Sequence, residues 1–368
     1  MKNKIWLSPP HLTGTELQYL EQALEQNWIT TTGPQVQQFE ECLCRLSGAS
    51  NVLATSSGTA AIHLALLTVG VKPGDYVLCP VFTFAATAFP VLYCGAIPVF
   101  IDSEKDTWNM DPSLLLKAIR QLTEQNKKPA AIIAVDIYGN PADYTTIRAL
   151  ADHYGIPLVE DAAQAFGSTY ENKICGTAGD LGIYSFNGNK IITTGGGGAL
   201  LTALPELHKQ ASLLANQSNT GTHYYLHPQA GYNYRMSNVL AALGIAQTSV
   251  LAERVKQKKR IFEKYSCLIQ KDTVAQQELP KASSNRWLSC FLFEDQAERD
   301  KVFYALSSSG IDSRFLMNPL HRQPVFSGYP SYLNGISDDL FSRGLCLPSG
   351  TALTDETINY ICSLINSA

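Results

Sequence analysis

Three short segments of this 368-residue chain carry residue types that together could bind a single cofactor. Lys190 stands alone among apolar and β-prone residues, just before four consecutive glycines at 195–198. Burial lowers the proton affinity of a lysine amine, and the neutral amine can attack an aldehyde. An apolar run at 157–159 ends in two acids, the second of which is Asp161. A Ser-Ser-Gly-Thr turn at 56–59 precedes a predicted helix, whose first N–H groups and dipole attract anions.

Each of these segments also has an ordinary structural interpretation. Serine, threonine and glycine before a helix commonly form an N-cap, and an aspartate at a strand end commonly caps a helix or faces solvent. A lone lysine is usually a surface residue, and four glycines can form a hairpin turn. Together, however, the segments provide an amine, an acid for a pyridine nitrogen and an anion-binding turn. That is the set of groups that a pyridoxal phosphate (PLP) site requires.

The order of apolar runs and helical patterns indicates how these segments are positioned. Over the first 250 residues short buried strands alternate with helices, which favours a mostly parallel sheet with helices on both faces. The carboxyl ends of such strands form the edge where open α/β sheets bind ligands. The predicted strands are 51–54, 76–79, 97–101, 130–135 and 156–159, and the predicted helices include 62–69, 83–93 and 144–154.

The rest of the chain favours a second, smaller domain. Helical character runs from 236 to about 268 with few interruptions, and a helix of this length often joins two lobes. A strand at 285–293, a helix at 298–309 and a closing helix follow. We predict an α/β protein with a large PLP-binding domain of residues 1–250 and a smaller C-terminal α+β domain of residues 251–368.

The composition argues against several other classes of protein. With a formal net charge of −4 and no long basic run, the chain lacks the basic surface of a nucleic-acid-binding protein. The uncharged stretch at 76–101 could span a bilayer, but Pro80, Pro90 and Pro98 divide it into a buried β-α-β unit. The nine cysteines form no CxxC pair, so neither a disulfide framework nor a zinc site is expected. Reduced thiols and an N-terminus without an apolar signal segment favour a cytoplasmic protein.

The chain resembles the DegT/DnrJ/EryC1/StrS family of nucleotide-sugar aminotransferases in five segments: SGTAAIHLAL, EDAAQAFG, SFNGNKIITTGGGGAL, GYNYRMSNVLAALGIAQ and CLPSGTALT. The likeness covers essentially the whole chain. It implies the PLP-dependent transferase fold type I (aspartate aminotransferase-like), PLP as cofactor, L-glutamate as amino donor and a homodimer with shared active sites. Within the family the chain is most similar to bacterial enzymes that aminate carbon 4 of UDP-4-keto-6-deoxy-N-acetylglucosamine, for bacillosamine and other glycans.

The resemblance also implies roles for particular residues. Lys190 would hold PLP as a Schiff base, Asp161 would pair with the pyridinium nitrogen, and Gln164 would contact the ring hydroxyl. The other cofactor contacts would be Phe84 on the ring face, Gly58, Thr59 and Ser185 at the phosphate, and Asn233 at the phosphate of the neighbouring subunit. The residues implied for the sugar nucleotide are Asn27, Trp28, Ile29, Thr30, Arg314, Phe315, Leu316, Met317 and His321. No metal ligand is implied.

One segment departs from the family pattern, and other functions stay open. Close relatives commonly carry Arg-Pro-Leu-Trp where this chain has Arg314-Phe315-Leu316-Met317, so an aromatic plane that could contact base or sugar is lost. A GDP- or dTDP-linked keto-sugar is therefore an alternative substrate. A PLP-dependent sugar dehydratase is another alternative, although dehydratases of this family replace the Schiff-base lysine with histidine. A non-enzymatic regulator would be expected to carry a DNA-binding segment, which neither the length nor the charge of the chain supplies.

Overall fold

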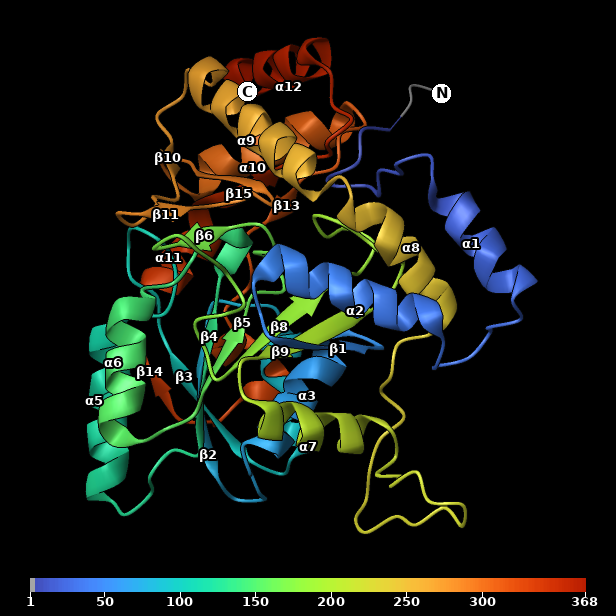
Figure 1. Ribbon diagram of the computed structural model, residues 1–368. Coiled ribbons are helices and arrows are strands. Elements are labelled where there is room, and N and C mark those ends of the chain that lie inside the picture. The colour runs from blue at the N-terminus through green and yellow to red at the C-terminus, as the bar shows by residue number, and fades with distance from the viewer. Residues whose placement is uncertain (1–3) are drawn as a thin grey trace.

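An eight-stranded sheet lies at the centre of the computed structural model, which describes residues 4–368 (Figure 1). All neighbouring strands from β8 to β14 pair in parallel, whereas β9 is antiparallel to both β1 and β8. The predicted mostly parallel α/β sheet is therefore confirmed. Its spatial order is β1 (Asn51–Thr55), β9 (Gly198–Thr202), β8 (Leu181–Ser185), β5 (Leu158–Asp161), β4 (Ala131–Val135), β2 (Tyr76–Pro80), β3 (Ile97–Ile101) and β14 (Ser331–Tyr332).

Helices cover both faces of this sheet, because its strands carry buried apolar side chains on both sides. The helices on one face are α3 (Gly58–Thr68), α4 (Phe89–Tyr93) and α7 (Pro205–Ala215). Those on the other face are α5 (Pro112–Glu124) and α6 (Tyr144–Tyr154), together with α2 (Pro34–Ser47) and α8 (Asn238–Thr248) over the half that contains β1. A further helix, α1 (Glu16–Glu25), packs on α8 (Figure 1).

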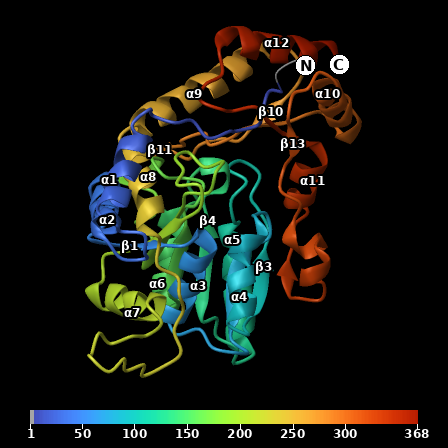
Figure 2. The same ribbon diagram turned by 90° about the vertical axis from the view of Figure 1, so that its right-hand side faces the viewer.

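A second, four-stranded antiparallel sheet lies with its helices at one end of the large sheet (Figure 2). Helices α9, α10 and α12 share an apolar core with its strands. A third, small sheet joins β11 (Ala282–Ser283) to the hairpin of β6 (Thr169–Tyr170) and β7 (Lys173–Ile174). The elements of this part are β10 (Val274–Ala275), β12 (Ser289–Leu292), β15 (Gly344–Leu347), β13 (Arg314–Phe315), α9 (Leu251–Leu268), α10 (Gln296–Ser308), α11 (Ile336–Arg343) and α12 (Asp355–Ser367).

The predicted single helix over 236–268 is wrong, because the segment forms two helices, α8 and α9, with a break at Ser249 and Val250. The hydroxyl of Thr248 donates to the carbonyl of Ile245, and that of Ser249 donates to the carbonyl of Ala246. Hydroxyls that bond back to the preceding turn compete with the backbone and bend helices. The sequence TSV therefore ends α8, and α9 then packs on the smaller sheet.

Two other predicted elements differ in extent. The helix predicted at 83–93 is divided into a 3-10 turn, Ala85–Thr87, and the short α4, in which Pro90 occupies the first turn. Proline lacks an N–H and is tolerated only there. The strand predicted at 285–293 is reduced to β12, and the preceding residues contact the cavity described below.

The division into residues 1–250 and 251–368 stays a prediction. The break between α8 and α9 lies beside residue 250, but β14 of the later segment pairs with β3 in the large sheet, with Ser331 opposite Phe100. The stretch 76–101 forms β2, α4 and β3, as predicted for a buried β-α-β unit. No helix within residues 4–368 is both long and apolar enough to cross a membrane.

Candidate active site

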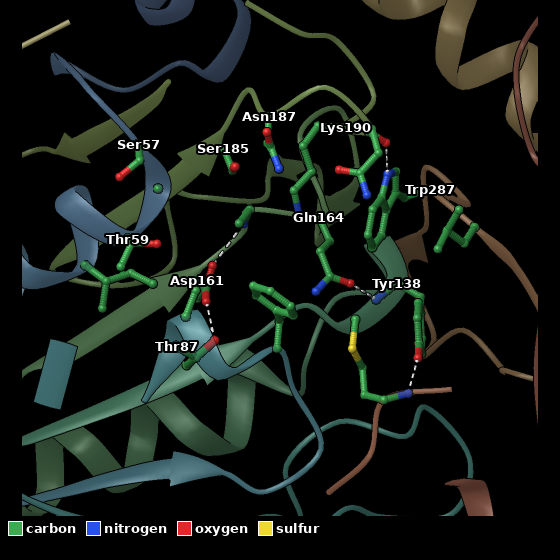
Figure 3. Close-up of a pocket in the computed structure, with 18 of the residues that line it drawn as sticks. Ser57, Thr59, Thr87, Tyr138, Asp161, Gln164, Ser185, Asn187, Lys190 and Trp287 are labelled. Atoms are coloured by element: carbon green, nitrogen blue, oxygen red, sulfur yellow. Dashed lines mark hydrogen bonds between the residues drawn. The ribbon is translucent and has the colours of Figure 1, made fainter. Parts of the chain in front are cut away.

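A cavity of about 520 Å³ lies beyond the carboxyl ends of β5 and β8, between the large sheet and the four-stranded sheet (Figure 3). This is the edge at which open α/β sheets bind ligands. The structure brings seven of the eight predicted cofactor residues into its lining: Gly58, Thr59, Phe84, Asp161, Gln164, Ser185 and Lys190. The four-stranded sheet and the chain leading to it add Trp287, Arg314 and Cys346.

Lys190 projects into the cavity from the loop that follows β8. Its side chain is partly buried, and its Nζ lies 4.3 Å from the centroid of the Trp287 ring. Burial lowers the pKa of Lys190 to about 8, although the negative charge of Asp161 acts in the opposite direction. A substantial fraction of the amine is therefore neutral near physiological pH, as a nucleophile toward an aldehyde must be.

Asp161 is the last residue of β5 and is almost completely buried, with 4% exposure. Its Oδ2 accepts a hydrogen bond from the Thr87 hydroxyl at 2.8 Å, and its Oδ1 accepts one from the Ala163 N–H at 3.2 Å. Burial raises the pKa of Asp161 above its ordinary value, while these two hydrogen bonds and the charge of Lys190 oppose that rise. A fixed, buried carboxylate of this kind suits the protonated nitrogen of a pyridine ring.

The turn before α3 forms the other end of the cavity. Ser57 is the N-cap of α3, and its side chain accepts from the N–H of Ala60 at 3.0 Å, so the ordinary capping role is confirmed. Gly58 lies so close to Ser185 that a Cβ at position 58 would be 3.1 Å from the Ser185 Cβ. The glycine thus lets the start of an 11-residue helix stand beside the Ser185 hydroxyl, which suits a phosphate.

Gln164 and Phe84 also line the cavity. The Gln164 Oε1 accepts a hydrogen bond from the N–H of Tyr138 at 2.7 Å, which fixes the amide group. Tyr138 adopts a left-handed conformation with φ 56°, a strained geometry for a residue with a Cβ. Phe84 is 61% exposed although it follows an apolar stretch, as expected for a ring face that binds a partner. An amine, a buried carboxylate, an anion-binding turn and an open aromatic face together fit PLP.

The residues predicted for the sugar nucleotide divide into two groups. Arg314, Phe315 and Met317 line the cavity, whereas Leu316 is buried with 2% exposure and lies outside the lining. The lining from this one chain does not include Asn233 or His321, nor the segment Asn27, Trp28, Ile29 and Thr30. His321 instead lies 3.4 Å from a carboxylate oxygen of Asp338. The roles of this second group stay predictions.

Sequence reasoning missed Tyr138, Trp287 and Thr87, which all line the cavity. No motif marked Tyr138, and Trp287 lay within a stretch predicted as a strand. The rings of Tyr138 and Trp287 come together only in the folded protein, where the smaller sheet packs on the end of the large one. No sequence pattern marked Thr87 as a site residue, because its importance comes from the hydrogen bond of its hydroxyl to Asp161 in the folded protein.

The pH dependence of cofactor uptake tests the state of Lys190. Only the neutral amine attacks an aldehyde, so the rate at which apoprotein takes up added PLP is expected to rise about tenfold per pH unit below the pKa. It should level off above about 8, the pKa to which burial lowers Lys190. Stopped-flow absorbance measures this rate. A rate that keeps rising toward about pH 10.4, the pKa of an ordinary lysine, would contradict the buried geometry.

Comparisons with known proteins show to which family the chain is related. The model of the DegT/DnrJ/EryC1/StrS aminotransferase family matches residues 10–366. EpsN of Bacillus subtilis (strain 168), named as a pyridoxal phosphate-dependent aminotransferase, is 45% identical over 97% of this chain and 93% of its own. The GDP-perosamine synthase of Escherichia coli O157:H7 is 35% identical over 97% and 96% of the two chains. The UDP-4-amino-4,6-dideoxy-N-acetyl-beta-L-altrosamine transaminase of Campylobacter jejuni is 32% identical over 94% and 92%.

A solved structure extends the comparison to the fold. The crystal structure of a DegT DnrJ EryC1 StrS aminotransferase from Brucella abortus matches with a TM-score of 0.91 at 30% identity. The match covers 96% of this chain and 95% of that one. The predicted fold type I architecture is confirmed by this likeness.

Proposed function

The chain belongs to the DegT/DnrJ/EryC1/StrS aminotransferase family and is a PLP-dependent sugar aminotransferase. On that premise we propose that it transfers an amino group from L-glutamate to carbon 4 of a UDP-linked 4-keto-6-deoxy-N-acetylhexosamine. The observation that carries this proposal is the single cavity that holds Lys190 opposite the buried Asp161, with the turn at Gly58 at its end. We also propose that the enzyme acts in the cytoplasm as a homodimer.

Each residue of the cavity has a distinct role in this proposal. When bound, PLP would supply an electron-accepting ring and an aldehyde carbon that carries the amino group between the two half-reactions. Lys190 would hold the cofactor covalently at rest, and its Nζ, once free, would take a proton from the α-carbon of the donor as a general base. The charge of Asp161 keeps the ring nitrogen protonated. Gln164 holds the ring hydroxyl, and Phe84 covers one ring face.

Different residues of the cavity serve the phosphate and the sugar nucleotide in this proposal. Gly58, Thr59 and Ser185 bind the phosphate. Arg314, with a side chain that is 67% exposed, also lines the cavity. An exposed guanidinium matches the charge and geometry of a diphosphate, so Arg314 is the residue of this chain that we assign to the nucleotide. Met317 and Phe315 lie next to it along the chain and contact the sugar or the base.

The choice of nucleotide has a direct test. The name of the Campylobacter jejuni relative supports a UDP-linked substrate, whereas the more similar Escherichia coli relative is named for a GDP-sugar, so a GDP-linked keto-sugar is the second candidate. We expect kcat/KM for UDP-4-keto-6-deoxy-N-acetylglucosamine to exceed that for GDP- and dTDP-linked 4-keto-6-deoxyhexoses by about 10²-fold. A preference for the GDP-linked sugar in the same purified assay would replace the first candidate with the second.

Subunit complementation tests the shared active site. In the proposed dimer each site takes Lys190 from one chain and Asn233 from the other, and Asn233 is exposed outside the cavity of its own chain. A hybrid of a Lys190→Ala chain and an Asn233→Ala chain then contains one intact site and one doubly altered site. Mixing and reassociating the two inactive variants should restore about one quarter of wild-type activity, because about half of the dimers are hybrids. No recovery in verified hybrids would mean that Asn233 does not act across the interface.

A further inference from the structure

Trp287 is the one aromatic side chain placed directly against the Lys190 amine among the described residues, and the proposed function gives it no role. Its ring centroid lies 4.3 Å from Nζ of Lys190, with the nitrogen over the ring. In Figure 3 Lys190 lies between Asp161 and Trp287. The face of an indole attracts a cation, and the attraction is stronger where water is excluded.

The indole of Trp287 is fixed by hydrogen bonds to the loop that carries the lysine. Its Nε1–H donates to the carbonyl of Asn189 at 2.7 Å, and Asn189 is the residue directly before Lys190. The backbone carbonyl of Trp287 accepts a hydrogen bond from Nζ of Lys258 at 2.8 Å. The backbone N–H of Trp287 donates one to Oδ1 of Asn285 at 2.8 Å. One residue therefore binds both the backbone next to the lysine and the lysine amine itself.

A second aromatic ring, that of Tyr138, lies next to the ring of Trp287. The Tyr138 ring is stacked on it, with centroids 6.5 Å apart and planes inclined by 19°. Tyr138 is held in turn by its N–H bond to Gln164 and by its hydroxyl, which accepts from the N–H of Met317 at 2.8 Å. Trp287 is only 4% exposed, so its orientation is set by packing as well as by hydrogen bonds. The indole ring of Trp287 is therefore held in one orientation relative to the Lys190 amine.

We propose that Trp287 is a positioning residue for proton transfer, and that its indole face holds the ammonium form of Lys190 between the acceptance and the delivery of a proton. The inference rests on the proposed role of Lys190 as proton carrier, but not on which sugar is the substrate. The lone pair of Nζ would form a bond to the α-hydrogen of the donor, and the electron pair of the broken C–H bond would be accepted by the electron-withdrawing ring that bound PLP supplies. Nζ then carries one positive charge, which it loses when it delivers the same proton.

Several other charged or titratable groups face Lys190. Asp161 faces it across the cavity, and Tyr138 and Arg314 line the same cavity. Lys258 and His11 line a small neighbouring cavity that Lys190 also borders. The negative charge of Asp161 raises the pKa of Lys190 and so favours the ammonium form. The indole of Trp287 favours the ammonium form as well, but it carries no charge. It therefore stabilises the protonated Lys190 less than a second carboxylate would, and Lys190 can still release the proton.

The experiment compares Trp287→Leu, which keeps the site apolar but removes the ring, with Trp287→Phe, which keeps a smaller ring. The first readout is the pH midpoint of PLP uptake by the apoprotein, which reports the pKa of Lys190. Because the ring stabilises the charged amine, Trp287→Leu should lower this midpoint by about one unit and Trp287→Phe by less. The second readout is the primary isotope effect with L-glutamate deuterated at the α-carbon. It should increase in Trp287→Leu, because proton transfer becomes slower relative to the other steps.

Trp6→Leu is the matched control, since the exposed Trp6 carries Lys4 over its ring at 4.0 Å, a similar contact on the surface. Neither readout should change in that variant. If Trp287→Leu does not fold, Lys258→Met removes a donor to the Trp287 carbonyl without touching the ring face, and it should shift both readouts in the same direction by less. An unchanged or raised midpoint with an unchanged isotope effect, in folded protein, would overturn the proposal. A wild-type protein that does not react with L-glutamate at all would instead contradict the proposed function.

Discussion

Replacing Lys190 with alanine is expected to reduce transamination by about 10⁴-fold or more. The reason is that, in the proposed function, a single nitrogen that lines the cavity of about 520 Å³ provides both the covalent link to the cofactor and the proton carrier. Steady-state kinetics with saturating donor and keto-sugar measure the loss. The substitution should leave the fold intact, because the Lys190 side chain makes no hydrogen bond within residues 4–368 and its Nζ lies over the ring of Trp287.

An amine added in solution separates the two roles of Lys190. If the missing group is a general base, ethylamine and methylamine should restore part of the donor half-reaction of Lys190→Ala, and more basic amines should restore more. Lys190→Arg is the matched control, since it keeps a positive charge but cannot become neutral at ordinary pH. Transamination by Lys190→Ala at nearly the wild-type rate would contradict the assignment of this residue.

Replacing Asp161 with asparagine is the second large effect that we expect. The substitution preserves shape but removes a fixed negative charge from a buried position, where Asp161 is 4% exposed. Loss of preorganised electrostatic stabilisation at such a point typically raises the barrier by about 3–4 kcal/mol, or about 10²–10³ in rate. Single-turnover kinetics of the donor half-reaction give the rate constant without interference from product release. An unchanged rate constant would refute the role of Asp161 at the ring nitrogen.

Thr87→Val provides a graded comparison, because the Thr87 hydroxyl donates to Oδ2 of Asp161. That hydrogen bond lowers the pKa of Asp161, which burial raises. Without the bond the pKa should rise further, so the carboxylate is neutralised at a higher pH. The acid limb of the pH–rate profile should therefore move upward in Thr87→Val, while the rate at high pH falls far less than in Asp161→Asn. An acid limb that stays in place would mean that another group governs it.

The sequence allowed the prediction of the half of the site that lies on the large sheet. Asp161 ends an apolar strand, and Gly58 follows another strand and begins a helix, so local patterns place both at one edge of a parallel sheet. The family resemblance then supplied the roles of Gln164 and of Phe84, and the local pattern around Phe84 alone indicates a core residue. The fold class, the cofactor and the type of enzyme predicted in this way are confirmed.

The half of the site that lies toward the smaller sheet could not be predicted. Trp287 meets Tyr138 only through contacts between segments about 150 positions apart, and no periodicity within either segment encodes such a contact. The left-handed Tyr138 and the break at Ser249 are likewise set by hydrogen bonds that depend on neighbouring residues. Asn233 and the segment around Trp28 were assigned by the family resemblance, Asn233 to the site of a neighbouring subunit, and their roles stay predictions.

An absorbance spectrum of the purified protein, before and after L-glutamate, tests the central claim most directly. After incubation with PLP the wild type should show the visible band of a cofactor bound through Lys190. L-Glutamate should bleach that band, and the keto-sugar should restore it. Lys190→Ala should not pass through this cycle catalytically. If no band forms with PLP, or if the band does not respond to L-glutamate or any other amino donor, the cavity around Lys190 and Asp161 is not the site of an aminotransferase.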